Sequence, residues 1–137
     1  MTKQYDVALN WIITDLCDFS CEYCFFRSSA DRTIQPILIS PLMSTLKKTG
    51  KTFLIIFSGG EPFLVPNFLE ACRRITLEHY IGIVSNTAGP DVEKFANDID
   101  PDTVDCFTAS LHIKELEKKK INPEIYLQFS TFKRKGI

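Results

Sequence analysis

Short apolar runs alternate along the chain with longer segments in which apolar residues recur at helical spacing. The strand-like runs span residues 7–14, 52–57, 81–85 and 104–111. The segments with helical spacing span residues 40–48, about 67–78, a short stretch opened by Pro90 and Asp91, and a last stretch opened by Asn122 and Pro123. This is a βα unit repeated four times, and consecutive right-handed βα units build a parallel sheet. The pattern therefore predicts an α/β fold.

Local signals place the ends of the first helix. Ser40 is expected as its N-cap, Pro41 at its first helical position and Gly50 just past its end, because these residue types favour those positions. The continuous apolar run at 53–57 is typical of a strand that is covered on both faces.

Each predicted strand runs into a segment whose residues can carry chemistry. The four segments are the cysteine loop 17–24, the Gly-Gly-Glu-Pro stretch 59–62, Ser85-Asn86-Thr87, and Ser110-Leu111-His112. In parallel α/β sheets, sites collect where the strands end and the loops begin. We therefore expect the four segments to form one shared site.

The cysteine loop carries the most specific pattern in the chain, C-x3-C-x2-C at Cys17, Cys21 and Cys24. Three thiolates from one loop can bind three irons of a cubane cluster and leave the fourth iron open, as a reactive centre requires. Cys72 lies on the apolar stripe of its helix and Cys106 near the start of the fourth strand, so neither is expected to be a fourth ligand.

A zinc site that uses the same three cysteines and a histidine is the alternative. His79 and His112 are the two histidines of the chain, and neither has zinc-finger spacing to the loop. The spacing therefore favours a cluster over zinc.

The composition and net charge of the chain narrow the classes of function that it can have. A chain of 137 residues can bury a single core, and a net charge of −1 offers no electrostatic case for a nucleic-acid or membrane-surface partner. No apolar run is long enough to span a bilayer. The five cysteines are an odd number and three of them crowd together, which indicates a metal site in a reducing compartment rather than a disulfide framework. We therefore expect a cytoplasmic protein.

The cysteine loop directly follows the first strand, with Tyr23 as the aromatic residue before Cys24, and in this form it resembles the signature of the radical S-adenosylmethionine (radical SAM) superfamily. The resemblance continues in order through residues 59–62, Ser85-Asn86 and Ser110. It implies an α/β fold, a partial parallel (βα) barrel with about four of the units of a (βα)6-type domain. Residues 1–137 would then be a core domain that stops after the fourth unit, as in a fragment, a partial gene product or one half of a split enzyme.

The resemblance also implies cofactors and a reaction. A [4Fe–4S] cluster would cleave S-adenosylmethionine reductively into methionine and a 5′-deoxyadenosyl radical, which abstracts hydrogen from a peptide or small-molecule substrate. An electron donor such as flavodoxin or ferredoxin is expected as a partner. The alternative is a non-catalytic metal- or cluster-binding interaction module that retains the three-cysteine loop.

Several residues are assigned to the site by resemblance or by strand alternation. The expected S-adenosylmethionine contacts are Gly59, Gly60, Glu61 in a supporting role, Ser85, Asn86 and Ser110. Alternation along the fourth strand places Cys106, Thr108, Ser110 and His112 on one face. His112 is a candidate substrate contact or proton donor, or else a histidine hydrogen-bonded at a strand end. The aromatic residues Phe19, Tyr23 and Phe25 are expected to shield the cluster, and Asn10 to face a polar cavity or an internal network.

Overall fold

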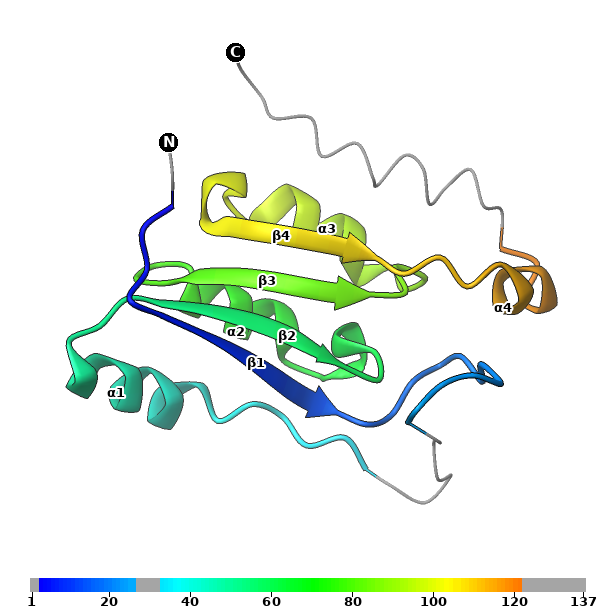
Figure 1. The fold of residues 1–137 in the computed structure, drawn as a ribbon, viewed down its shortest axis with the longest axis horizontal. Coiled ribbons are helices and arrows are strands. Elements are labelled where there is room, and N and C mark those ends of the chain that lie inside the picture. The colour runs from blue at the N-terminus through cyan, green and yellow to red at the C-terminus, as the bar shows by residue number, and fades with distance from the viewer. Residues whose placement is uncertain (1–2, 27–32, 122–137) are drawn as a thin grey trace, which may run out of the picture.

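Four parallel strands form the centre of the molecule. The computed structural model describes residues 3–26 and 33–121. The strands are β1 (Val7–Thr14), β2 (Phe53–Gly59), β3 (Tyr80–Ser85) and β4 (Val104–Ala109). They lie in the order β1-β2-β3-β4, and each pairs in parallel with the next (Figure 1). The α/β architecture of a partial parallel βα barrel is therefore confirmed.

A helix follows each strand. The helices are α1 (Ile39–Thr49), α2 (Phe68–Ile75), α3 (Asp91–Asp98) and α4 (Ile113–Lys118), and two short 3-10 turns are η1 (Pro62–Leu64) and η2 (Pro101–Thr103). α2 and α3 run behind the strands in Figure 1, whereas α4 lies beyond the strand ends, beside the loop that follows β1. Among these helices, none is long and apolar enough to cross a membrane.

The predicted start of α1 is wrong by two residues. Its N-cap is Leu38 rather than Ser40, and the first helical hydrogen bond runs from the Leu42 N–H to the Leu38 carbonyl oxygen (3.0 Å). Pro41 is therefore the third helical residue, where the missing N–H is still not needed for a bond within the helix. Gly50 ends the helix in the left-handed conformation (φ 66°) as predicted.

The main core lies between the sheet and the first three helices. Strand side chains such as Ile55, Phe57 and Ile83 are fully buried there. They pack with aromatic rings from the helices, since Phe68 meets Phe57 edge-on at 5.2 Å and Phe63 meets Phe68 at 5.1 Å. Edge-to-face pairs at this spacing add to the stability that apolar burial provides.

The other face of the sheet is more open. One register row across it contains Asn10, Ile56, Gly82 and Cys106. Gly82 has no side chain because the Cys106 sulfur occupies its place, at 2.7 Å from where a Cβ would lie. The side chain of Asn10 is exposed on this face, contrary to the expected polar network, because no described segment covers it.

The fourth βα unit differs most from the prediction. β4 ends at Ala109 rather than at residue 111. Phe107 packs on the main core and Thr108 is exposed, as the alternation predicts. Ser110 and His112, however, lie past the strand, and His112 is the N-cap of α4, a helix that the pattern did not predict. The helix expected from Asn122 and Pro123 lies outside the described residues.

Candidate functional site

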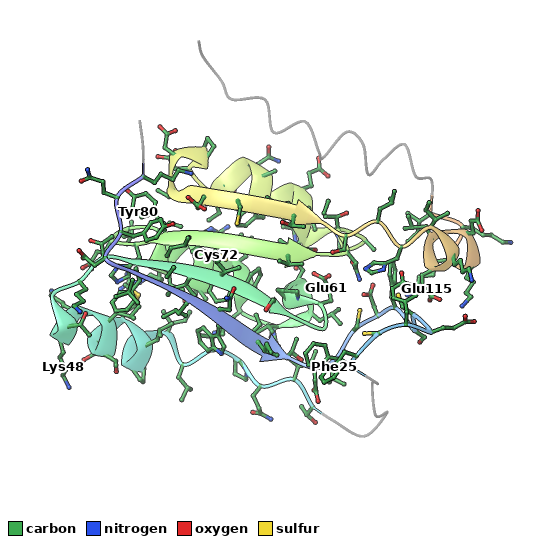
Figure 2. All side chains as sticks on the ribbon, viewed as in Figure 1. Phe25, Lys48, Glu61, Cys72, Tyr80 and Glu115 are labelled. Carbon is green, nitrogen blue, oxygen red and sulfur yellow. The ribbon has the colours of Figure 1, made fainter. Side chains whose placement is uncertain are left out.

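The predicted site residues lie at the carboxyl ends of the strands. Figure 2 shows Glu61, Phe25 and Glu115 at this end of the molecule, whereas Lys48 and Tyr80 mark the opposite end. Cys72 is fully buried in the main core, away from the cysteine loop. The parallel topology thus brings together the loops that follow β1, β2 and β3 and the start of α4.

The Gly-Gly turn is joined to the cysteine loop by backbone hydrogen bonds. The Gly60 N–H donates to the Thr14 carbonyl oxygen and the Glu61 N–H to the Leu16 carbonyl oxygen, both at 2.8 Å. A Cβ on Gly59 or Gly60 would lie well under 3.0 Å from those carbonyl oxygens. Gly59 also has a φ of 123°, a conformation that side chains disfavour. The two glycines are therefore required by neighbouring backbone, a reason that stands independently of any ligand.

Glu61 is the central buried polar group of this region, with 3% of its surface exposed. One carboxylate oxygen accepts hydrogen bonds from the Phe63 N–H (3.1 Å) and the Ser85 hydroxyl (2.9 Å). The other oxygen accepts from the Asn86 N–H (2.7 Å). Burial raises the pKa of Glu61, and these three hydrogen bonds oppose that rise. Glu61 thereby ties η1 to the end of β3.

Asn86 continues this network into the cysteine loop. Its side-chain amide donates to the Asp18 carboxylate (2.7 Å) and approaches the Cys17 sulfur (3.7 Å). Its carbonyl oxygen accepts from the Ala88 N–H (2.9 Å), and the Ser85 hydroxyl oxygen accepts from the Thr87 N–H (2.9 Å). The Asn86 side-chain amide at the end of β3 is therefore directed at the first cysteine.

Cys17, Cys21 and Cys24 are free, partly exposed thiols. The Cys17 sulfur accepts from the Phe19 N–H at 3.4 Å. Burial, with smaller contributions from the negative charges of Asp18 and Glu61, raises the pKa of Cys17 to about 11. A thiol with this pKa is protonated at neutral pH, so metal binding must displace its proton.

The three cysteine thiols are suitable metal ligands, although the structure does not arrange them as a formed metal site. In the part of the chain that the structure describes, no group of three or more His, Cys, Asp or Glu side chains is arranged to hold a metal ion. The three thiols nevertheless lie on one short loop, free of disulfides, and thiolate is the ligand that iron–sulfur clusters use. The residues fit a cluster chemically.

His112 lies against the cysteine loop. Its Nδ1 atom is 3.5 Å from the Cys21 sulfur and 2.7 Å from the Tyr23 hydroxyl. Its ring stacks on Tyr23 (centroids 6.0 Å apart) and meets the edge of Phe19 (5.8 Å). Spacing alone does not predict this contact, because 91 residues separate His112 from Cys21 and the fold joins them.

The three aromatic residues that are expected to shield the cluster differ in burial. Phe19 is buried, with 4% of its surface exposed, whereas Tyr23 and Phe25 are 70% and 94% exposed. That the three rings shield a cluster stays a prediction, which these exposures do not test. Tyr23 packs on His112, and Phe25 packs edge-on against the neighbouring Phe26 ring (5.6 Å).

Helix α4 contributes residues to the site that sequence reasoning missed. Glu115 accepts a hydrogen bond from the Ser20 N–H (3.1 Å) and forms an ion pair with Lys118 (2.6 Å). Leu116 is fully buried and forms a small second core with Phe19. The sequence signal for this helix is weak, since Leu116 is one of two apolar residues in a charged segment of six.

Ser110, the remaining predicted contact, follows β4 directly. Its N–H donates to the Ser85 carbonyl oxygen at 2.8 Å, so its backbone extends the β3–β4 pairing by one bond. Its position beside Ser85 places it at the same edge of the sheet as the cysteine loop.

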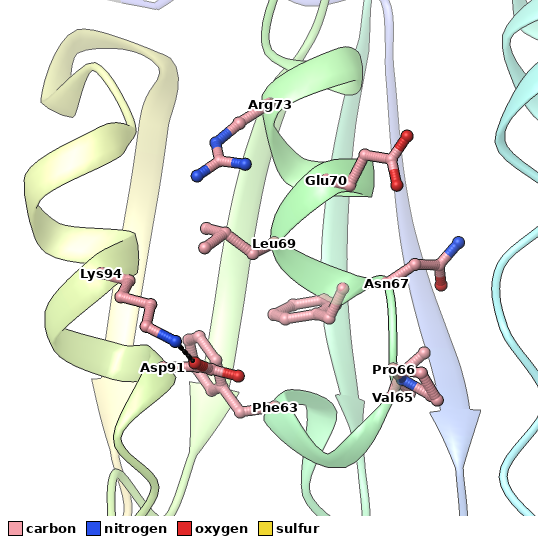
Figure 3. A pocket seen from close by; sticks show the side chains of 10 residues that line it. Phe63, Val65, Pro66, Asn67, Leu69, Glu70, Arg73, Asp91 and Lys94 are labelled. Carbon is pink, nitrogen blue, oxygen red and sulfur yellow. Dashed lines mark hydrogen bonds and ion pairs between the residues drawn. The ribbon is translucent and has the colours of Figure 1, made fainter.

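Two cavities lie near these loops. One of about 310 Å³ is bordered by Asp18 and Glu61, and so touches the network described above. The other, of about 260 Å³, lies between α2 and α3 (Figure 3). It is lined by Phe63, Leu69 and the Asp91–Lys94 ion pair among others, and it contains none of the predicted site residues.

A comparison with known protein families identifies a family that matches the chain. The family model described as the radical SAM superfamily matches residues 11–131. No curated protein and no solved structure matches the chain. The family match covers most of the 137 residues, including the cysteine loop and the ends of all four strands. The chain therefore belongs to the radical SAM superfamily.

Proposed function

We propose that this chain is a radical SAM enzyme, or part of one, in which Cys17, Cys21 and Cys24 hold a [4Fe–4S] cluster. The observation that carries the proposal is the placement of three free thiols on the loop after β1, where the ends of β2 and β3 are hydrogen-bonded to that loop. When bound, the cluster and S-adenosylmethionine would supply the reductive C–S cleavage that generates a 5′-deoxyadenosyl radical for hydrogen abstraction. Membership of the family supports this chemistry.

In this proposal the protein's own groups support the thiolates. Each cysteine gives up its proton on binding iron. The Phe19 N–H and the Asn86 amide are directed at the Cys17 sulfur, and donors of this kind stabilise a thiolate. Because burial raises the pKa of Cys17 to about 11, these donors matter most at that ligand.

The residues proposed for S-adenosylmethionine are those that border the loop. They are Gly59, Gly60, Glu61, Ser85, Asn86 and Ser110. Both oxygens of the Glu61 carboxylate already accept hydrogen bonds from the protein, which favours a supporting role over direct contact with the ligand. The substrate is proposed to be a peptide or small molecule, and flavodoxin or ferredoxin the electron donor.

Anaerobic reconstitution of the chain with iron and sulfide tests the proposal. We expect a brown protein that releases methionine and 5′-deoxyadenosine from S-adenosylmethionine after reduction with dithionite. Replacing Cys17, Cys21 or Cys24 with alanine should abolish the cluster, because each is expected to bind one iron. Iron and sulfide content and the absorption spectrum measure the loss.

Cys72→Ala and Cys106→Ala are the matched controls, since Cys72 is buried among apolar residues and Cys106 lies on β4. Both variants should retain the cluster. Loss of the cluster in either variant would show that the ligand assignment is wrong. A wild-type cluster that forms without any cleavage would contradict activity in this chain alone.

One contact favours the second candidate, a non-catalytic metal-binding module. His112 lies 3.5 Å from the Cys21 sulfur, so the fold offers three cysteines and a histidine, a set that zinc also binds. Stable binding of one equivalent of colourless zinc that iron and sulfide do not displace would support this candidate and contradict the first.

A further inference from the structure

His112 is held in place on several sides. Phe19 meets its ring edge-on and Tyr23 stacks on it. Its backbone carbonyl accepts from the Glu115 and Leu116 N–H groups at 3.0 Å each, as the N-cap of α4. The ring is therefore positioned before any cofactor binds, and its Nδ1 atom points at Cys21 and Tyr23.

The tautomer of His112 decides which role Nδ1 has toward each neighbour. With Cys21 as a neutral thiol, an unprotonated Nδ1 can accept from the Tyr23 hydroxyl, which lies at 2.7 Å. A metal-bound Cys21 has no S–H and can only accept. The 3.5 Å contact then becomes a hydrogen bond only if Nδ1 carries the proton.

Tyr23 can give up its bond to Nδ1 at little cost. Its side chain is 70% exposed, so a released hydroxyl finds water as a partner. A neutral histidine can exchange its proton between the two ring nitrogens through solvent. His112 is only half-buried, so solvent reaches part of its side chain.

From these contacts we propose that His112 is a positioning residue whose Nδ1–H donates to the sulfur of Cys21 when Cys21 is a metal-bound thiolate. This inference rests on the proposed function. A hydrogen bond to a ligand sulfur stabilises the more negative, reduced state of a cluster and so raises its reduction potential. His112 thereby makes the cluster easier to reduce, and it is a neighbour of a ligand rather than a substrate contact.

Two substitutions separate the hydrogen bond from the packing. His112→Phe keeps an aromatic ring between Phe19 and Tyr23 and removes the donor. His112→Asn removes the ring and keeps an N–H donor near the position of Nδ1. The reduction potential of the reconstituted full chain is measured by spectroelectrochemical titration. Tyr23→Phe is measured beside these variants, because the Tyr23 hydroxyl interacts with the Cys21 thiol as well as with Nδ1.

We expect His112→Phe to lower the reduced-to-oxidised ratio at the wild-type midpoint by about three- to tenfold, the size of one hydrogen bond. That ratio corresponds to a shift of about 28 to 59 mV at 59 mV per tenfold for one electron. His112→Asn should recover part of the shift, and Tyr23→Phe should lower the potential by less than His112→Phe does. An unchanged potential in His112→Phe, or equal losses in His112→Phe and His112→Asn, would overturn the inference.

A second measurement keeps this test independent of the proposed function. If the wild-type chain binds no cluster, the proposed function fails, and the chain loaded with zinc still provides a thiolate at Cys21. The nitrogen-15 NMR shifts of His112 then report its tautomer. Protonated Nδ1 supports the inference, whereas an unprotonated or zinc-bound Nδ1 overturns it.

Discussion

Gly60 shows how tightly single residues define the site. The turn after β2 passes so close to the cysteine loop that a Cβ on Gly60 would lie well under 3.0 Å from the Leu16 carbonyl oxygen. The neighbouring backbone cannot move away freely, because the Glu61 N–H donates to that same oxygen at 2.8 Å. A side chain here must displace either the turn or the loop that carries Cys17.

We predict that Gly60→Ala destabilises the chain by about 1–3 kcal/mol, the usual cost of forcing atoms into a packed site. Gly89→Ala is the matched control, since no atom lies within 4 Å of its Cβ position. The control should be neutral or stabilising by up to about 1 kcal/mol. Urea unfolding measures both, and equal stabilities of the two variants would show that the close approach is not a constraint.

For single residues, the sequence predicts which of them lie at the ends of the strands better than it predicts the contacts that they make there. The Gly-Gly-Glu stretch and Asn86 were expected around a ligand, and the structure places them in a network with one another. The bond from Asn86 to Asp18 spans 68 positions, and no local pattern encodes such a pairing. Glu61 is different, because the family resemblance already implied a supporting role for it.

Among the elements, α4 is the one whose importance only the fold reveals. It packs on the cysteine loop through the small core of Leu116 and Phe19 and through the bond from the Ser20 N–H to Glu115. Lys119 adds an ion pair with Asp18 at 3.9 Å. The loop therefore has its own support, separate from the main core beneath the sheet.

We predict that Leu116→Ala loosens the cysteine loop without unfolding the sheet. Leucine-to-alanine changes at buried sites cost about 2 kcal/mol or more, so amide hydrogen exchange at Phe19 and Ser20 should speed up more than tenfold. Exchange at Ile55 in β2 should stay unchanged. Ile113→Ala is the control, because Ile113 lies on the same helix and is 54% exposed. Equal exchange in both variants would mean that α4 does not hold the loop.

The elements with strong periodic patterns were predictable, and the short polar ones were not. β1 has the predicted bounds of residues 7–14, since this segment is an apolar run in which Asn10 and Thr14 are the polar residues. β4 stops at Ala109, two residues before its apolar pattern ends, because the chain turns there into α4. The face assignment of Ser110 and His112 relied on strand alternation, so it failed where the strand ended.

For the whole molecule, the parallel sheet determines where the chemistry lies. All four strands point the same way, so the loop after β1, the turn after β2, the end of β3 and the start of α4 meet at one edge. This convergence was predictable from the βα repeat. The approach of His112 to Cys21 was not, since it depends on how far each strand extends and how the chain bends afterwards.

The stability of the whole molecule should depend on one buried histidine at the opposite end of the sheet. His79 is 6% exposed, and its Nδ1 atom accepts from the Phe53 N–H at 3.4 Å, where β2 begins. Its Nε2 atom is buried without a hydrogen-bond partner among the described residues. Burial lowers the pKa of His79 below its ordinary value of 6.5, because a charged ring would lose hydration and the bond from Phe53.

A lowered pKa means that the unfolded chain binds a proton more readily than the folded one. The contribution of His79 to stability is therefore independent of pH above about pH 6.5, and stability is lost progressively as the pH falls from there toward the folded-state pKa. We predict that the free energy of unfolding decreases between pH 7.5 and 5.5 with a slope of up to about 1.4 kcal/mol per pH unit.

His79→Asn keeps an acceptor for the Phe53 N–H and cannot be protonated. This variant should be less stable at every pH, because the ring that packs on Phe53 is gone, but its stability should vary less with pH in this range. Urea unfolding of both proteins at several pH values measures the two slopes, and identical slopes would assign the pH dependence to other groups.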